Sequence, residues 1–138
     1  MLNKKYKSKV DWWLHLTFII MLILNIWLIV DFIISPSFVM GISGGVILIC
    51  NIFTLPWWLN SYYFLEEEQL LINIGYIKVR IPYKSVESIQ ETRIPWASMA
   101  LSLDRIEIKY KKKNFAETVL ISPVRKQEFL KELNQRVK

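Results

Sequence analysis

Two long hydrophobic segments dominate the first half of the chain. Residues 12–34 contain one charged residue, Asp31, and residues 38–59 contain none. An α-helix rises about 1.5 Å per residue, so either segment is long enough to cross a hydrocarbon core of about 30 Å. Only residues 35–37, Ser-Pro-Ser, lie between them. This pattern predicts two transmembrane helices, over 12–34 and 38–59, that form a tight antiparallel hairpin.

A cleaved signal peptide is the alternative for the first segment. The basic N-terminus fits it, but the apolar run is long, no small-residue cleavage site follows, and a second apolar segment comes at once. We therefore favour two spans. Residues 1–11 carry four lysines, the 35–37 loop carries no charge, and residues 60–138 are rich in Lys and Arg. Because basic flanks stay in the cytoplasm, we expect a multi-pass protein of the cell membrane with both termini cytoplasmic.

The expected organisation thus has three parts: a basic cytoplasmic N-terminus (1–11), the transmembrane hairpin (12–59) and a cytoplasmic domain (60–138). Inside the hairpin, Gly41 and Gly45 form a small-xxx-small pattern. Packing of the hairpin on itself is favoured over a dimer seam as its explanation. Asn25 and Asn51 are expected to bond across the helices. Asp31 lies close enough to the outer end to reach water, so we interpret the hairpin as an anchor and not as a transporter.

Alternation of apolar and polar residues predicts strands in the second half. The expected strands cover 70–74, 77–81, 86–94, 105–110 and 115–121, with an irregular connection at 95–101 that exposes Trp96. Ser122 is a suitable N-cap and Pro123 a suitable first residue for a closing helix, because proline needs no N–H there. Phe129 begins the apolar face of that helix. The fold class is α+β, with a curved antiparallel sheet closed by a C-terminal helix.

The stretch Ser102-Leu-Asp104-Arg105 resembles a catalytic constellation, but the residue types exclude most chemistry. The one histidine (His15) and the one cysteine (Cys50) both lie in the spans, so residues 60–138 offer neither a base for Ser102 nor a zinc site. Neighbouring strand residues point to opposite faces, so Asp104 and Arg105 cannot act together. We expect Asp104 to accept backbone N–H groups in a turn and Arg105 to point outward. No catalytic, cofactor-binding or metal-binding residues are predicted.

The balance of charge points to an anionic partner. The chain has a formal net charge of +6, and residues 60–138 carry 14 Lys or Arg against 10 Asp or Glu, a net of +4. Lys111, Lys112 and Lys113 are expected at a hairpin tip, with Arg125 and Lys126 near them. Anionic lipid headgroups attract such residues, and a merely solvated tip is an equal alternative. The membrane tether and the glutamates argue against nucleic acid.

Two motifs carry a family resemblance. Residues 102–108, Ser-Leu-Asp-Arg-Ile-Glu-Ile, and residues 120–130, Leu-Ile-Ser-Pro-Val-Arg-Lys-Gln-Glu-Phe-Leu, resemble bacterial PH-like domains of small membrane-anchored proteins, as does the run at 70–83. The resemblance covers about residues 61–136 and implies a PH-like antiparallel barrel or sandwich capped by the helix. That family includes the sublancin immunity protein, which implies protection against a bacteriocin, although that type has one span.

Two classes of function follow. The first is a non-enzymatic protective module at the inner leaflet that intercepts a membrane-active peptide or a partner protein. The second is a structural or regulatory scaffold of an envelope complex, which could act as an oligomer. A lipid-binding module is a further alternative.

Overall fold

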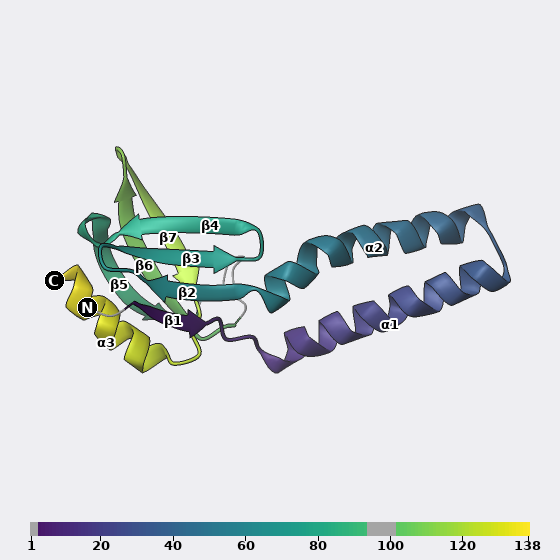
Figure 1. The fold of residues 1–138 in the computed structure, drawn as a ribbon, viewed down its shortest axis with the longest axis horizontal. Coiled ribbons are helices and arrows are strands. Elements are labelled where there is room, and N and C mark those ends of the chain that lie inside the picture. Colours follow the sequence, from purple (N-terminus) through teal and green to yellow (C-terminus); the bar gives the residue numbers. More distant parts are fainter. Residues whose placement is uncertain (1–2, 94–101) are drawn as a thin grey trace.

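The computed structural model describes residues 3–93 and 102–138. The two apolar segments form helices with the predicted bounds, α1 (Trp12–Ile34) and α2 (Phe38–Leu59). They run antiparallel and project from one end of a β-rich domain (Figure 1). Both are long and apolar enough to cross a membrane. Ser37 begins α2 as its N-cap, because its Oγ accepts a hydrogen bond from the Met40 N–H at 3.2 Å.

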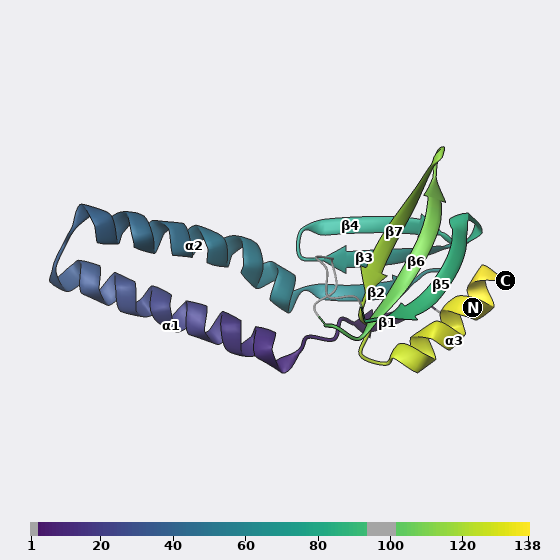
Figure 2. The ribbon, with the colours of Figure 1, turned by 180° about the vertical axis from the view of Figure 1, so that it is seen from behind.

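The domain consists of two antiparallel sheets and a closing helix, as the strand pattern predicted. One sheet has the order β1-β2-β3-β4 and the other β5-β6-β7. Helix α3 lies across the domain at the end away from the hairpin (Figures 1 and 2). The bounds are β1 (Lys4–Lys7), β2 (Ser61–Leu65), β3 (Gln69–Ile74), β4 (Ile77–Pro82), η1 (Tyr83–Ser85), β5 (Val86–Thr92), β6 (Arg105–Lys112), β7 (Phe115–Ile121) and α3 (Lys126–Val137). The expected position of Trp96 lies outside the described residues.

Strand β1 was not predicted, because the sequence indicated only a basic tail before the hairpin. Lys4–Lys7 pairs antiparallel with β2, with Tyr6 opposite Tyr63. Tyr6 is the one buried residue of the four, so the segment has too little alternation to be recognised as a strand. The helical hairpin is therefore inserted between the first two strands of the domain.

The chain between β1 and this insertion also joins the two sheets. Ser8 forms a bridge with Pro123, the Lys9 N–H donates to the Ser122 carbonyl at 2.5 Å, and the Val124 N–H donates to the Lys7 carbonyl at 3.0 Å. These bonds keep residues 122–124 extended, so α3 begins only at Lys126. The prediction that Ser122 caps the helix and that Pro123 is its first residue was therefore wrong.

The core lies between the two sheets and α3. Phe129 and Leu133 of α3 are fully buried. The Phe129 ring meets the rings of Tyr6 and Tyr63 edge-on, with centroid distances of 5.3 and 6.1 Å. The apolar face predicted for the last helix thus packs against the first two strands.

Inside the hairpin, Gly41 faces the other helix. A Cβ at Gly41 would lie 3.2 Å from the Phe32 ring, whereas a Cβ at Gly45 would meet nothing within 4 Å. Asn25 and Asn51 are buried. The Nδ2 and Oδ1 atoms of Asn25 and the Nδ2 atom of Asn51 have no hydrogen-bond partner among the described residues. The expected hydrogen bond across the helices is therefore not formed.

Candidate functional site

The start of α1 is attached to the domain by residues 102–104, the turn before β6, which we call the Ser102 turn. One Asp11 carboxylate oxygen accepts from the Ser102 hydroxyl at 2.7 Å, and the other accepts from the Leu103 N–H at 3.0 Å. Burial raises the pKa of Asp11, but these hydrogen bonds together outweigh it and hold the pKa below its usual value. The residue before the first span is thereby fixed to the turn that precedes β6.

Asp104 connects the same turn to α3. Its two carboxylate oxygens pair with Lys126 at 2.5 Å and with Lys9 at 3.5 Å. The hydrogen bond from Lys126 is the main reason that the pKa of Asp104 is lowered. The sequence predicted that Asp104 would accept backbone N–H groups, but that task falls to Asp11 and to Ser102, whose Oγ accepts from the Asp104 N–H at 3.2 Å.

Arg105 was expected to point outward and is instead buried, with 6% of its surface exposed. Its Nε donates to the Ser102 carbonyl at 2.7 Å. The guanidinium therefore reinforces the turn that receives Asp11. The apparent catalytic stretch is the attachment point of α1.

The end of α2 is received by the turn between β3 and β4. The carbonyl of Asn60, the C-cap residue, accepts from the Gly75 N–H at 3.2 Å and from the Asn73 Nδ2 at 2.9 Å. Gly75 has a φ of +60°, and a Cβ there would lie 3.1 Å from the Trp57 backbone. The only glycine after residue 45 is thus required by its backbone angle and by the close approach of the turn to α2.

Pro56 creates a second contact between this turn and α2. A proline within a helix cannot donate to the carbonyl four residues earlier, which here is that of Ile52. The Tyr76 hydroxyl lies 3.3 Å from that carbonyl and donates to it. In a membrane such a freed carbonyl needs another donor, because lipid supplies none. The domain therefore completes the hydrogen bonding of the second helix.

The helices are also joined to each other at this end. The Trp58 Nε1 donates to the His15 Nδ1 at 2.8 Å, and the Trp58 ring stacks on Phe18 with a centroid distance of 5.0 Å. Both ends of the hairpin are thus held by the domain and by each other.

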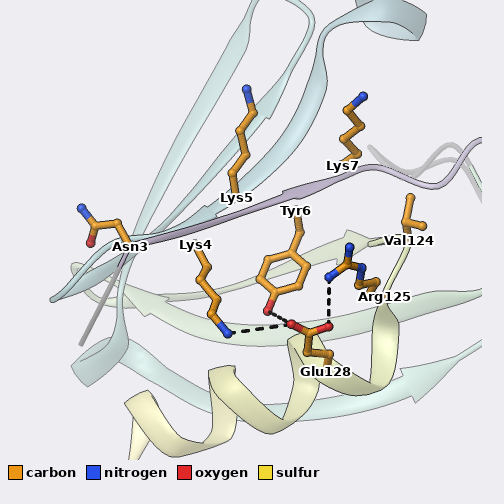
Figure 3. A pocket seen from close by; sticks show the side chains of 8 residues that line it. All are labelled: Asn3, Lys4, Lys5, Tyr6, Lys7, Val124, Arg125 and Glu128. Atoms are coloured by element: carbon orange, nitrogen blue, oxygen red, sulfur yellow. Dashed lines mark hydrogen bonds and ion pairs between the residues drawn. The ribbon is translucent and has the colours of Figure 1, made fainter.

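A pocket of about 640 Å³ lies between β1 and the start of α3. Lys4, Tyr6 and Arg125 converge on the Glu128 carboxylate, at 3.8, 3.2 and 3.4 Å, while Lys5 and Lys7 point away from it (Figure 3). Burial, reinforced by Glu132 and Glu128, raises the pKa of Tyr6 to about 12. The pocket lies between β1, the strand that was not predicted, and α3. The charged side chains that point into it, Lys4, Arg125 and Glu128, already pair with one another.

A second groove, of about 320 Å³, lies between β4 and the tip of the β6–β7 hairpin. We call it the tip groove; it is lined by Lys78, Val79, Arg80, Pro82, Ser85, Tyr110, Lys111, Lys112 and Lys113. Its lining holds five cations and no acid. Among the described residues, one of these five cations forms an ion pair: Lys112 lies 3.9 Å from Glu117.

A family model described as a bacterial PH domain matches residues 61–137. The chain belongs to this family. No curated protein and no solved structure matches it. The matched region starts at β2, so β1 and the helical hairpin lie outside it. PH domains are typically binding modules without catalytic activity.

The PH domain separates the cations that were expected to lie together. Lys111, Lys112 and Lys113 occupy the β6–β7 tip, as predicted, with Lys113 in the left-handed region (φ 55°). Arg125 and Lys126 lie beyond the other end of β7, and Lys126 is paired with Glu91 at 2.6 Å as well as with Asp104. The residues that do face the tip are Lys78 and Arg80 of β4. Lys78 and Arg80 alternate with apolar residues in the sequence, but only the folded sheets show which other cations these two residues meet.

Proposed function

We propose that this protein is a membrane-anchored, non-enzymatic PH domain at the inner leaflet that protects the cell against a membrane-active peptide. The hairpin over 12–59 is then a two-span anchor, and residues 1–11 and 60–138 are cytoplasmic. The observation that carries this proposal is the attachment of both ends of the hairpin to the domain. Such an arrangement turns the anchor and the binding domain into one unit.

A domain on a single flexible linker would sample many orientations above the bilayer. Here Asp11 binds the Ser102 turn directly before α1, and Asn60 binds the β3–β4 turn directly after α2. With both connections fixed, the domain keeps one face toward the headgroups. A peptide that disturbs the hairpin would therefore act directly on the domain, which supports a role in intercepting such peptides.

The β3–β4 turn is the part of the domain that we assign to lipid contact. Tyr76 and Ile77 are 66% and 47% exposed, and Tyr76 reaches a carbonyl seven residues before the end of α2. An exposed tyrosine next to Gly75, which closely approaches the Trp57 backbone, suits a membrane interface, where aromatic rings with a polar edge are enriched.

The test of the protective role is expression of the full chain in a peptide-sensitive host. We expect the inhibitory concentration of the cognate peptide, sought among those encoded beside the gene, to rise. A Gly75→Val variant, which disrupts the β3–β4 attachment, should lose the effect, while the exposed-site variant Lys131→Gln should keep it. Unchanged sensitivity to every such peptide, with the protein present in the membrane fraction, would rule the role out.

The orientation has its own test. A reporter that is active only in the cytoplasm, fused to the C-terminus, is expected to be active. An active periplasmic or extracellular reporter at that position would place the domain outside and contradict the inner-leaflet proposal.

A scaffold of an envelope complex is the second candidate function. The observation that favours it is the open space at Gly45. A Cβ added to Gly45 would have no atom within 4 Å, so a further helix could approach closely there. Crosslinking in membranes is expected to give oligomers that Gly45→Ile abolishes if this function holds. Monomer alone, with no co-purified partner, would count against it.

A further inference from the structure

The tip groove brings together four cations that form no ion pair with another described residue. Lys78, Arg80, Lys111 and Lys113 have no carboxylate within ion-pair distance among the described residues. Its floor is less polar, because Val79 and Tyr110 also line it. The groove therefore has a basic rim over a partly apolar floor.

One wall of the groove is an unpaired strand edge. Strand β4 is last in its sheet, and its register with β3 pairs Ile77 with Ile74 across a two-residue turn. Backbone groups alternate in direction along an antiparallel strand, so Ile77, Val79 and Ile81 bond to β3. The N–H and C=O groups of Lys78 and Arg80 then point to the free edge, where an extended segment can add as a strand.

The other wall is the β6–β7 tip, which extends beyond β5. Strand β5 begins opposite Tyr110, so Lys111 and Lys112 have no paired strand on that side of β6. Phe115, opposite Lys112, is 75% exposed. The tip thus presents charge and an aromatic ring beside an unpaired edge.

The β6–β7 tip lies farther from the helical hairpin than the β3–β4 turn does (Figures 1 and 2). Strand β6 begins at Arg105, beside the attachment of α1, and carries the tip away from the hairpin (Figures 1 and 2). Seven residue steps at about 3.3 Å separate Arg105 from Lys112 by roughly 23 Å. Strand β6 rises steeply across the axis of the hairpin, so only part of this length carries the tip away from a bilayer around α1 and α2 (Figures 1 and 2). Electrostatic attraction in physiological salt decays over about 8 Å, so the headgroups attract the tip less strongly than they attract the β3–β4 turn.

We propose that the tip groove binds an extended acidic segment of a partner protein, which adds to the free edge of β4. Side chains alternate along a strand, so the segment has acidic residues on the side of Lys78 and Arg80 and apolar residues on the side of Val79. Cations on the edge repel basic strands, and this selects an acidic partner. This inference goes beyond the protective role and does not depend on it.

The test uses the full chain in nanodiscs of neutral phosphatidylcholine and a labelled hexapeptide that alternates glutamate and valine. We expect saturable binding that weakens with salt and falls at least tenfold in the Lys111→Glu, Lys112→Glu double variant. The matched double variant Lys131→Glu, Lys138→Glu, with the same change in net charge, should bind within twofold of the parent. Methylation of the peptide N–H groups that face β4 should also cost at least tenfold.

Three results would overturn the proposal. Equal losses in the two double variants would mean unspecific charge attraction, and full competition by vesicles of anionic phosphatidylglycerol would assign the groove to lipid. The chain's own acidic segment is the connection between β2 and β3, which contains Glu67 and Glu68. Self-association that disappears in a Glu67→Lys, Glu68→Lys variant would assign the groove to a second copy of the chain. None of these results bears on peptide tolerance, so failure here is distinct from failure of the protective role.

Discussion

The hydrogen bond between Tyr76 and the Ile52 carbonyl gives a quantitative test of the attachment between hairpin and domain. Pro56 removes the donor that Ile52 would have in a regular helix, and the Tyr76 hydroxyl at 3.3 Å replaces it. A hydrogen bond of this kind contributes about 1 kcal/mol. The Tyr76→Phe substitution should therefore lower the free energy of unfolding by about that amount, or the melting temperature by about 4 °C.

The same reasoning predicts how Pro56 changes this loss. In a Pro56→Ala background the N–H of residue 56 is restored and donates to Ile52, so Tyr76→Phe should cost close to zero. The double-mutant cycle is measured by thermal unfolding of the full chain in mild detergent, followed by tryptophan fluorescence. Tyr62→Phe is the control, because the Tyr62 hydroxyl has no hydrogen bond among the described residues. Additivity of the two substitutions within about 0.4 kcal/mol would refute the reasoning.

The remaining predictions concern the domain and its attachment to α1. Asp11→Asn should weaken the acceptor for Ser102 and Leu103 and lower stability by about 1 kcal/mol in chemical denaturation, whereas a neutral result would mean that the Ser102 turn does not depend on the carboxylate. Phe129→Ala should cost about 3–5 kcal/mol in the same assay, because a fully buried ring leaves a cavity, and a loss below about 1 kcal/mol would contradict the packing described here. The lowered pKa of Asp104 adds stability that is present above its unfolded pKa and is lost as the pH falls through the folded value. Unfolding free energy should thus decline between about pH 5 and pH 3, and Asp104→Asn should flatten that slope; an unchanged slope would show that this carboxylate does not titrate with folding.

The helices and most of the strands followed from local pattern. The bounds of α1 and α2 agree with the hydrophobic runs because the spans need nothing beyond continuous apolarity. The alternation at 105–110 also predicted β6 correctly, with Ile106, Ile108 and Tyr110 inward. Patterns of this kind report on which face of an element is buried, and they do so without knowledge of its neighbours.

Local pattern failed where a residue's role depends on a distant segment. Lys4–Lys7 is a strand only because β2 lies beside it, after a hairpin of two helices. Ser122 resembles a helix cap, but pairing with the segment after β1 keeps it extended. Asp104 was assigned to its own turn, yet its partners are Lys9 and Lys126, from opposite ends of the chain.

The sequence by itself determined that the chain has two apolar helices, an antiparallel β domain and a closing helix, with the one histidine and the one cysteine in the apolar helices. Composition and period suffice for this, since each is a property of neighbouring residues. The tertiary structure decided that the hairpin is inserted between β1 and β2, that the Ser102 turn and the β3–β4 turn hold its two ends, and that Lys78 and Arg80 join Lys111–Lys113 in one groove. These contacts join residues far apart along the chain, and no local period encodes which distant segments meet.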